Sequence, residues 1–327
     1  MSKKIKVIAV VGPTASGKTA LSVELAKRLN GEIISCDSMQ IYKGMDIGTA
    51  KVTENEAQGV PHHLVSFISP ESSFSCADYV RLAREKIAEI TSRGKTPIFC
   101  GGTGLYLDSV LTENEFSEVG DNAEIREALA KKSPDELYEE LLRIDSAAAE
   151  KTHKNNVKRV IRALEIYYGT GITKTEWDRR SREKESRYES VIIGLDFKSR
   201  ETLYERINRR VDIMTENGLI DEVKALDSES FRASTASQGI GYKEILSYFD
   251  GRLSLSEAIE EIKKGSRNYA KRQLTWFKRN ESIRWIYRDL PESYGFKDKN
   301  AADTETVLIV NHALGIIESS FADKSGK

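Results

Sequence analysis

A glycine-rich segment near the N-terminus, Gly12-Pro-Thr-Ala-Ser-Gly-Lys18-Thr19, limits what this chain can fold into more than any other part of its sequence. The segment fits the pattern G-x-x-x-x-G-K-[ST]. An apolar run (6–11) precedes it, and residues 18–29 carry apolar side chains at helical spacing. A strand, a glycine loop and a helix in this order form a phosphate-binding loop, or P-loop. We therefore predict a diphosphate-binding segment made of Gly12, Pro13, Thr14, Ala15, Ser16, Gly17, Lys18 and Thr19.

The chemistry of such a loop requires a diphosphate and its metal ion, but not ATP in particular. Backbone N–H groups surround the anion, Lys18 neutralises phosphate oxygens, and the hydroxyl of Thr19 is the predicted Mg²⁺ ligand. ATP-hydrolysing P-loop proteins usually add an acidic residue after an apolar strand. The strand predicted at 96–100 runs into glycines without one. Asp196 follows another apolar run, but we favour a strand-end or helix-capping role for it.

Alternating strands and helices predict an α/β fold with a P-loop NTPase-like parallel sheet flanked by helices. The predicted strands are 6–11, 32–35, 96–100, 191–195 and 283–287, and the helices between and after them are 18–29, 77–93, 200–214, 219–226, 254–279 and 305–319. Between these parts, only helices are predicted, at 123–129, 134–144, 147–151 and 157–168. We therefore divide the chain into a core with C-terminal helices, residues 1–113 and 185–327, and an all-helical insertion, residues 114–184.

The charge of the chain is balanced, with 50 basic and 51 acidic residues among 327. A net charge of -1 gives no general attraction to nucleic acid, so a polyanion site must come from local clusters. Basic residues outnumber acidic ones in residues 151–183 and 267–285, and the second stretch also contains Tyr269, Trp276 and Phe277. Each stretch is either an RNA-binding surface or a solvated helix face whose aromatic side chains point into the core.

The cysteines and histidines of the sequence indicate neither a metal-binding cluster nor a disulfide. Cys36, Cys76 and Cys100 lack CxxC spacing, and His62 and His63 have no ligand partners in the sequence, so we expect structural roles for all of them. No stretch approaches the ~20 apolar residues of a membrane span. We expect a cytoplasmic protein without a membrane segment, and a monomer.

Eight motifs in order, between about residue 5 and residue 287, make the chain similar to the tRNA dimethylallyltransferases, also called tRNA isopentenyltransferases or the IPP transferase family. The motifs are GPTASGKT (12–19), DSMQIY (37–42), GMDIGTAK (44–51), PHHL (61–64), GGTGLY (101–106), RVIRALE (159–165), GIGYK (239–243) and KRQLTWFKR (271–279). The resemblance implies transfer of a dimethylallyl group from dimethylallyl diphosphate to N6 of adenine 37, next to the anticodon of tRNA. Mg²⁺ would be required, and diphosphate would be released.

The same resemblance assigns roles around the P-loop. Asp37 matches the family's general base, although a carboxylate at this place also suits a Mg²⁺ ligand or a helix cap. Ser38, Met39 and Gln40 would hold the flipped adenine, with the Gln40 amide as its main reader. Thr103 either contacts substrate or only shapes the glycine turn. The predicted catalytic residues are Asp37, Thr19, Lys18, Thr103 and Arg162.

The resemblance also implies that the insertion and the last helices contact the tRNA anticodon stem-loop. The predicted tRNA-binding residues are Asp37, Ser38, Met39, Gln40, Lys158, Arg159, Arg162, Gln238, Gly241, Tyr242, Lys243, Lys271, Arg272, Gln273, Trp276 and Arg279. One arginine of the pair Arg159 and Arg162 would reach the diphosphate or the transition state, and the sequence leaves open which one.

Two other functions are compatible with a P-loop. A small-molecule kinase would use ATP there, and the arginine-rich segment 204–210 would suit a phosphate-binding lid, but the basic aromatic stretch would then have no role. A nucleotide-gated RNA-binding module would use Asp37 only as a metal ligand and would catalyse no reaction.

Overall fold

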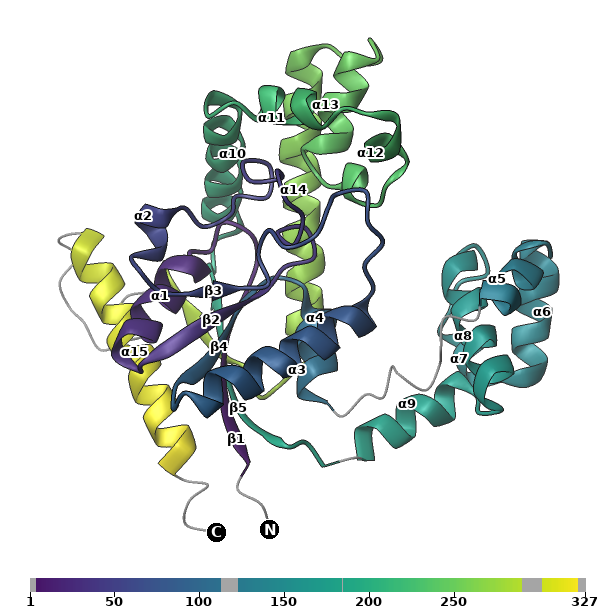
Figure 1. Ribbon diagram of the computed structural model, residues 1–327, viewed down its shortest axis with the longest axis horizontal. Helices are drawn as coiled ribbons and strands as arrows, with labels where there is room; N and C mark the ends of the chain where they lie inside the picture. The colour runs from purple at the N-terminus through teal and green to yellow at the C-terminus, as the bar shows by residue number, and fades with distance from the viewer. Residues whose placement is uncertain (1–3, 113–122, 184, 290–301, 323–327) are drawn as a thin grey trace. The chain divides into compact units, whose positions relative to one another are not determined.

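The computed structural model describes residues 4–112, 123–183, 185–289 and 302–322. These residues form two compact units (Figure 1): unit 1 runs to Asp108 and resumes at Tyr188, and unit 2 comprises residues 109–187.

Unit 1 is built on a six-stranded parallel sheet in the order β3-β2-β4-β1-β5-β6. Its strands are β1 (Ile5–Val11), β2 (Gly31–Cys36), β3 (His62–His63), β4 (Thr96–Gly101), β5 (Tyr188–Asp196) and β6 (Arg284–Tyr287). β1, which leads into the P-loop, pairs with β4 on one side and β5 on the other, so it is central. The predicted parallel α/β sheet flanked by helices is confirmed.

The helices of unit 1 include the long predicted ones and several short ones that were not predicted. They are α1 (Lys18–Arg28), α2 (Glu54–Ala57), α3 (Cys76–Ser92), α4 (Gly104–Leu111), α10 (Arg200–Glu216), α11 (Leu219–Leu226), α12 (Glu229–Ala233), α13 (Tyr242–Phe249), α14 (Leu255–Phe277) and α15 (Ala302–Ala322). The segments α2, α4, α12 and α13 are at most eight residues long. Short segments show little of a helical period, although α11, which is also eight residues long, was predicted.

Two of the apolar clusters of unit 1 support the site. In the first, the centre of the sheet (Val10 and Ile193) packs with Leu25 of α1 and Ile309 of α15, and Figure 1 shows these two helices side by side. In the second, Tyr242 of α13 packs with residues of α10, α11 and α14 and with the loop after β2. The first cluster supports the P-loop strand, and the second supports the loop that follows Asp37.

Unit 2 is helical throughout its described residues. It contains α5 (Ala123–Ala130), α6 (Pro134–Ile144), α7 (Ser146–Glu150), α8 (Val157–Thr170) and α9 (Lys174–Glu183) around a small core that includes Leu137, Leu141 and Leu164. Helix α9 was not predicted, because its sequence KTEWDRRSRE has no apolar period. It is instead supported by pairs at helical spacing, Lys174 with Asp178 and Glu176 with Arg180.

No helix in the described ranges combines the length and the apolar character that a membrane span requires.

A buried ion cluster at the start of β2 generates a stability prediction. Glu32, 3% exposed, accepts hydrogen bonds from His63 (2.6 Å), Arg93 (2.7 Å) and Lys95 (2.8 Å). Burial raises the pKa of this carboxyl, but the bonds from Lys95, His63 and Arg93 outweigh it and lower the pKa to about 2. The cluster therefore contributes stability above the ordinary pKa of 4.5, and this contribution is lost as the pH falls toward 2.

We predict that Glu32→Ala lowers the free energy of unfolding by about 2 kcal/mol at pH 7, because a buried charged acceptor is removed. Urea titrations at pH 7 and pH 3 test this, and the difference between wild type and variant should shrink at pH 3. Glu89→Ala, which removes an exposed partner of Arg93, is the matched control and should change little. An equal destabilisation by the two substitutions would contradict the buried role of Glu32.

Candidate active site

The P-loop is shaped by glycines at two constrained positions. Gly12 has φ +144° and Gly17, which caps α1, has φ +89°, both outside the range that other residues favour. A Cβ at Gly12 would also lie 2.2 Å from the carbonyl oxygen of Leu195 in β5. The loop therefore lies directly against the carboxyl end of the neighbouring strand, as the predicted P-loop requires.

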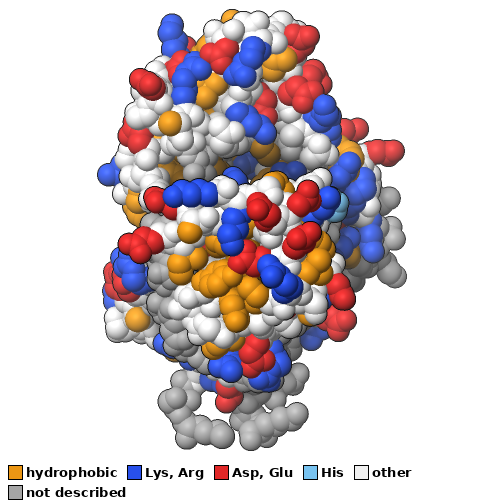
Figure 2. Space-filling model, turned by 90° about the vertical axis from the view of Figure 1, so that its right-hand side faces the viewer, with side chains coloured by type: hydrophobic (Ala, Val, Ile, Leu, Met, Phe, Trp, Pro, Cys, Tyr) orange, Lys and Arg blue, Asp and Glu red, His pale blue; other side chains and the backbone are white. Residues whose placement is uncertain are grey.

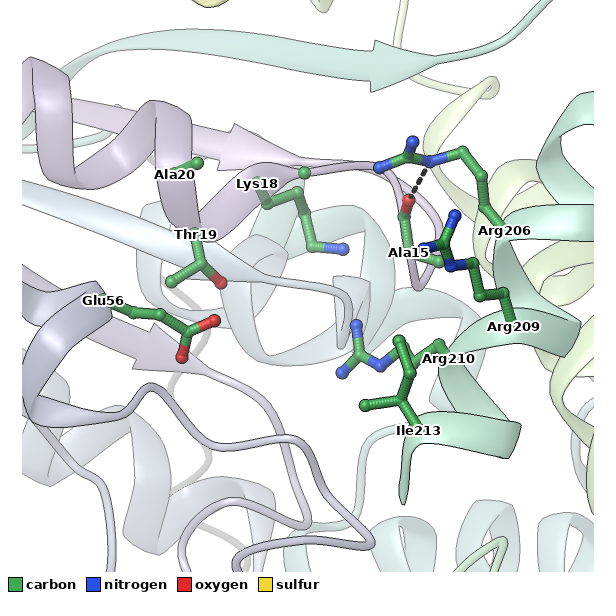
Figure 3. Close-up of a pocket in the computed structure, with 10 residues that line it drawn as sticks. Ala15, Lys18, Thr19, Ala20, Glu56, Arg206, Arg209, Arg210 and Ile213 are labelled. Carbon is green, nitrogen blue, oxygen red and sulfur yellow. Dashed lines mark hydrogen bonds between the residues drawn. The ribbon is translucent and has the colours of Figure 1, made fainter. Parts of the chain in front are cut away.

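A cavity of about 500 Å³ opens onto this loop (Figure 3). It is lined by Ala15, Gly17, Lys18, Thr19, Ala20, Glu56, Arg206, Arg209, Arg210 and Ile213. Figure 3 shows the side chains of Lys18 and Arg210 extending into the same space, with Thr19 and Glu56 at its other side. Several cations facing a glycine loop form a site for a compact, highly charged anion such as a diphosphate.

Of the four arginines of α10, the three that line the cavity, Arg206, Arg209 and Arg210, were not among the predicted site residues. Arg210 is largely buried, and burial lowers its pKa, while the charges of Asp37 and Glu56 act in the opposite direction. Arginine keeps its charge even so, because its ordinary pKa lies far above neutral pH. The sequence carries this signal as the arginine-rich segment 204–210, which by itself suits only the lid of a kinase.

Lys18 has a perturbed environment. Its Nζ donates to the carbonyl oxygen of Pro13 at 2.7 Å. The pKa of Lys18 is lowered to about 8, chiefly by burial and also by the charge of Arg210, while Cys100 and Asp37 act in the opposite direction. The charged form is therefore less favoured than usual before an anion binds, and an anion beside Nζ would restore it.

Side chains from distant parts of the chain bind the backbone of the P-loop. The amide of Gln273 in α14 accepts from the N–H of Thr14 (2.8 Å) and donates to the carbonyl of Gly102 (3.1 Å). Arg206 donates to the carbonyl of Ala15 at 3.1 Å. Gln273 is only 4% exposed, so its burial argues against the tRNA contact predicted for it. It links the P-loop to the glycine turn after β4 instead.

Asp37 lies in the loop after β2, next to the P-loop. Its Oδ1 accepts from the N–H groups of Met39 (2.9 Å) and Gln40 (3.4 Å), and its charge raises the pKa of Lys18 and Arg210. The carboxylate thus binds the backbone of its own turn, which starts no helix, and also faces the cations of the phosphate site. Neither feature tests the general-base role of Asp37, which stays a prediction.

Thr103 joins the turn after β4 to the Asp37 loop. Its Oγ1 accepts from the N–H of Ser38 at 3.1 Å, and its own N–H donates to the carbonyl of Cys36 at 3.0 Å. A Cβ at Gly101 would lie 2.1 Å from that same carbonyl oxygen, so the glycine allows the close approach. Of the two roles left open for Thr103, the described contacts support the shaping role.

Gln40 is held by a chain of polar contacts that begins at α13. Its Nε2 donates to the carbonyls of Thr49 (3.2 Å) and Ala50 (3.3 Å). The loop that carries these carbonyls is fixed by Glu222, which accepts from three backbone N–H groups at residues 46–48 and from the hydroxyl of Tyr242 at 2.6 Å. The amide predicted to bind adenine is therefore oriented by the protein.

This chain of contacts changes the interpretation of the GIGYK motif. Tyr242 is fully buried and Gly241 is also buried, with φ +100° at the start of α13. Burial argues against the tRNA contact predicted for both residues and favours a supporting role. Gln238 and Lys243 of the same motif region are exposed, and their predicted tRNA contact stays a prediction.

The basic stretch on α14 remains on the surface. Lys271, Arg272 and Arg279 are exposed, and the guanidinium of Arg279 lies 4.2 Å from the centroid of the Trp276 ring. Trp276 is partly buried and donates to Asp108 at 2.7 Å. Exposed cations beside a fixed aromatic ring are suited to an RNA backbone and a stacked base.

In unit 2, the predicted RNA-binding residues lie on α8. Lys158 and Arg159 are exposed, and Arg162 pairs with Glu165 at 3.4 Å. The reach of Arg162 or Arg159 to the diphosphate stays a prediction. Figure 2 shows basic and acidic side chains mixed over the visible face, as the balanced charge of the sequence implies.

Other candidate ligands have structural partners. Asp196 is fully buried, and its two oxygens accept from Arg200 at 3.0 and 2.8 Å, so the strand-end interpretation is confirmed. His63 belongs to the Glu32 cluster. The three cysteines are free thiols, and the described residues contain no cluster of histidines, cysteines or carboxylates that would bind a metal ion unaided.

Comparison with known proteins gives consistent matches. Residues 40–280 match the family described as IPP transferase. The tRNA dimethylallyltransferase of Anoxybacillus flavithermus is 50% identical over 97% of each chain, and that of Bacillus subtilis is 50% identical over 90% of this chain and 95% of its own. The crystal structure of a tRNA isopentenylpyrophosphate transferase from Bacillus halodurans is similar, with a TM-score of 0.71 and 44% identity, and covers 98% of this chain and 100% of its own.

A more distant structure adds a functional context. A eukaryotic dimethylallyltransferase described as acting on tRNA matches with a TM-score of 0.76 and 31% identity, covering 86% of this chain and 74% of its own.

The lowered pKa of Lys18 predicts how anion binding depends on pH. Affinity for inorganic diphosphate should fall as the pH rises above about 8, because the free protein then loses the Lys18 proton that the bound anion requires. Isothermal titration between pH 7 and pH 9.5 measures this, with a loss of up to about tenfold per pH unit. In Lys18→Met, the affinity still depends on pH through the ionisation of diphosphate itself, so this variant measures that background. Parallel profiles for the two proteins would refute the assignment.

Proposed function

The chain belongs to the IPP transferase family of tRNA dimethylallyltransferases, and on that premise we propose that its P-loop site transfers a dimethylallyl group from dimethylallyl diphosphate to N6 of adenine 37 in tRNA. The observation that carries the proposal is the carboxylate of Asp37 beside the cationic phosphate site, close enough to raise the pKa of both Lys18 and Arg210. A base and an anion cradle at one place suit a displacement whose leaving group is a diphosphate. None of the relatives named above supports the kinase alternative.

The leaving group determines what the P-loop must do. As the bond between C1 of the allyl group and the diphosphate oxygen breaks, negative charge grows on the diphosphate. Lys18 and the guanidinium of Arg210 face that charge from the cavity that the loop lines, and backbone N–H groups of a P-loop would add to them. These groups stabilise the transition state more than the ground state, because the charge is larger there.

The nucleophile needs a proton acceptor. The lone pair of an exocyclic adenine amine is delocalised into the ring, so N6 attacks C1 more readily as its proton is removed. Asp37 is the carboxylate at this place, and its Oδ1 is occupied by backbone N–H groups of its own turn. In the proposed reaction, N6 forms a bond to C1, the bond from C1 to oxygen breaks, and the N6 proton passes to Asp37.

The adenine must leave the base stack to reach this site. Ser38, Met39 and Gln40 follow Asp37 directly, and Thr103 and the contact chain from Glu222 fix their backbone and the Gln40 amide. For Gln40 to bind adenine, its amide would exchange or share its bonds to Thr49 and Ala50. A held loop of this kind reduces the ordering cost of binding the base.

Mg²⁺ is part of the proposal. Thr19 offers a hydroxyl at the cavity, Glu56 lines the same cavity, and Ser16 Oγ is buried with no hydrogen-bond partner among the described residues. These few oxygens fit a metal that takes most of its ligands from phosphate and water. A bound Mg²⁺ would neutralise charge on the departing diphosphate. We further propose that the protein acts in the cytoplasm as a monomer.

Incubation of the purified chain with Mg²⁺, unmodified tRNA and either labelled dimethylallyl diphosphate or γ-labelled ATP tests the function. Label should pass from the allylic donor to tRNA, and not to a transcript in which guanosine replaces adenine 37. Turnover of ATP without allyl transfer would establish the kinase, and RNA binding that requires nucleotide but yields no product would establish the binding module.

Replacing the proposed base should separate chemistry from binding. Asp37→Ala is expected to lower turnover by about 100-fold or more while donor affinity is largely kept, because a general base acts on the chemical step. Lys18→Ala should weaken donor binding as well as turnover. Single-turnover rates and donor titrations of both variants provide the measurement, and unchanged turnover in Asp37→Ala would remove it from the base role.

A further inference from the structure

Arg288 contacts the backbone of the P-loop at Ser16 and Gly17. It follows β6, and its backbone N–H donates to the carbonyl of Asp196 at 3.0 Å, which fixes it at the end of the sheet. Its Nη1 donates to the carbonyl of Ser16 at 3.2 Å, and a Cβ at Gly17 would lie 2.3 Å from that same nitrogen. The guanidinium therefore lies against the peptide that joins Ser16 to Gly17.

That contact determines where the next N–H group points. In a trans peptide, the carbonyl oxygen and the following N–H point in opposite directions. When Arg288 binds the Ser16 carbonyl on the outside of the loop, the N–H of Gly17 is turned to the inside, where a phosphate is bound. The preceding peptide is held differently: its Ala15 carbonyl accepts from Arg206 at 3.1 Å, and its Ser16 N–H donates to the carbonyl of Pro13 at 3.4 Å.

Glu305 holds Arg288 in this position. Its Oε1 accepts from Nε of Arg288 at 2.9 Å and from Nη2 at 2.8 Å, which leaves Nη1 directed at the loop. The Arg288 side chain is 15% exposed, whereas that of Glu305 is 40% exposed. A planar guanidinium that is bonded along one side has little freedom to rotate toward the anion.

Helix α15 supplies Glu305 and is itself firmly docked. Ile309, Val310, Ala313 and Ile317 are buried in the cluster that contains α1 and the sheet. The position of the C-terminal helix therefore sets the position of Glu305, and through Arg288 it affects the P-loop.

We propose that Arg288 and Glu305 are positioning residues for the diphosphate, and that α15 is therefore a working part of the phosphate site. The proposal deepens the function proposed above and rests on it. Arg288 orients the peptide between Ser16 and Gly17, and Glu305 keeps Arg288 on the outside of the loop.

Charge alone gives the opposite expectation, so the two explanations can be separated. If Glu305 only neutralised Arg288, removing its charge would raise the positive potential of the site and tighten anion binding. If Glu305 positions Arg288, Glu305→Gln should weaken the binding of inorganic diphosphate with Mg²⁺, roughly fivefold to tenfold. Glu305→Asp should recover part of the loss.

The experiment compares Glu305→Gln with Glu318→Gln, which makes the same change at an exposed position of α15 away from Arg288. Calorimetry gives the dissociation constant of diphosphate, and initial rates give KM for the donor and for tRNA. We expect weaker diphosphate binding and a higher donor KM only in Glu305→Gln, with KM for tRNA unchanged. Unchanged or tighter diphosphate binding in this variant would overturn the proposal.

Arg288→Lys provides a second variant, since a lysine cannot hold both Ser16 and Glu305 with a planar fork, and it should weaken diphosphate binding similarly. Thermal denaturation identifies any variant that fails to fold, and if Arg288→Lys fails to fold, the result for Glu305→Gln decides alone.

The proposed function and the positioning role can fail separately. A wild type that binds diphosphate but does not modify tRNA contradicts the proposed function, whereas loss of binding in neither variant contradicts only the role of Arg288 and Glu305.

Discussion

The proposed site depends on the backbone of residues 12–17, whose shape must present N–H groups to an anion. Ala15 gives this loop one apolar contact, with the cluster that contains Phe197 and Leu203. Its backbone carbonyls and N–H groups are bound by side chains that come from far along the chain, Arg206, Gln273 and Arg288. The sheet brings these side chains together, because β1 lies between β4 and β5 and the helices return over it. The fold thus places these three side chains around the P-loop.

The loop proposed to hold the base follows the same rule. The loop after β2 carries Asp37 and Gln40, but its shape is fixed from α11 and α13 through Glu222 and Tyr242. A carboxylate that accepts three backbone N–H groups is a strong and directional support. Motifs that look like separate recognition elements in the sequence therefore form a single support for the substrate-facing loop.

Much of the fold and of the candidate site was predictable from the sequence, and each feature that was not predictable has a physical reason. The P-loop, the parallel sheet and Asp37 next to the P-loop follow from local pattern and from the rule that loops at the carboxyl ends of parallel strands meet. The orientation of α14 was not predictable in the same way. The helical period places Gln273 on the same side of α14 as Trp276 and Arg279. Periodicity does not show which part of a helix other elements cover, and the structure places Gln273 in the interior of the protein. The arginines of α10 were visible but had no partner in the sequence, because their partner is the P-loop almost 200 residues earlier.

The distance along the chain between the P-loop and its supports has a consequence for biosynthesis. Residues 12–19 leave the ribosome early, whereas Gln273 is made 259 positions after Thr14 and Arg288 is made 272 positions after Ser16. Long-range contacts of this kind form late in folding. A nascent chain that ends before Arg206 contains the complete phosphate-binding motif without these three contacts. The contact from Arg288, the last of the three along the chain, forms only after β6 has been translated.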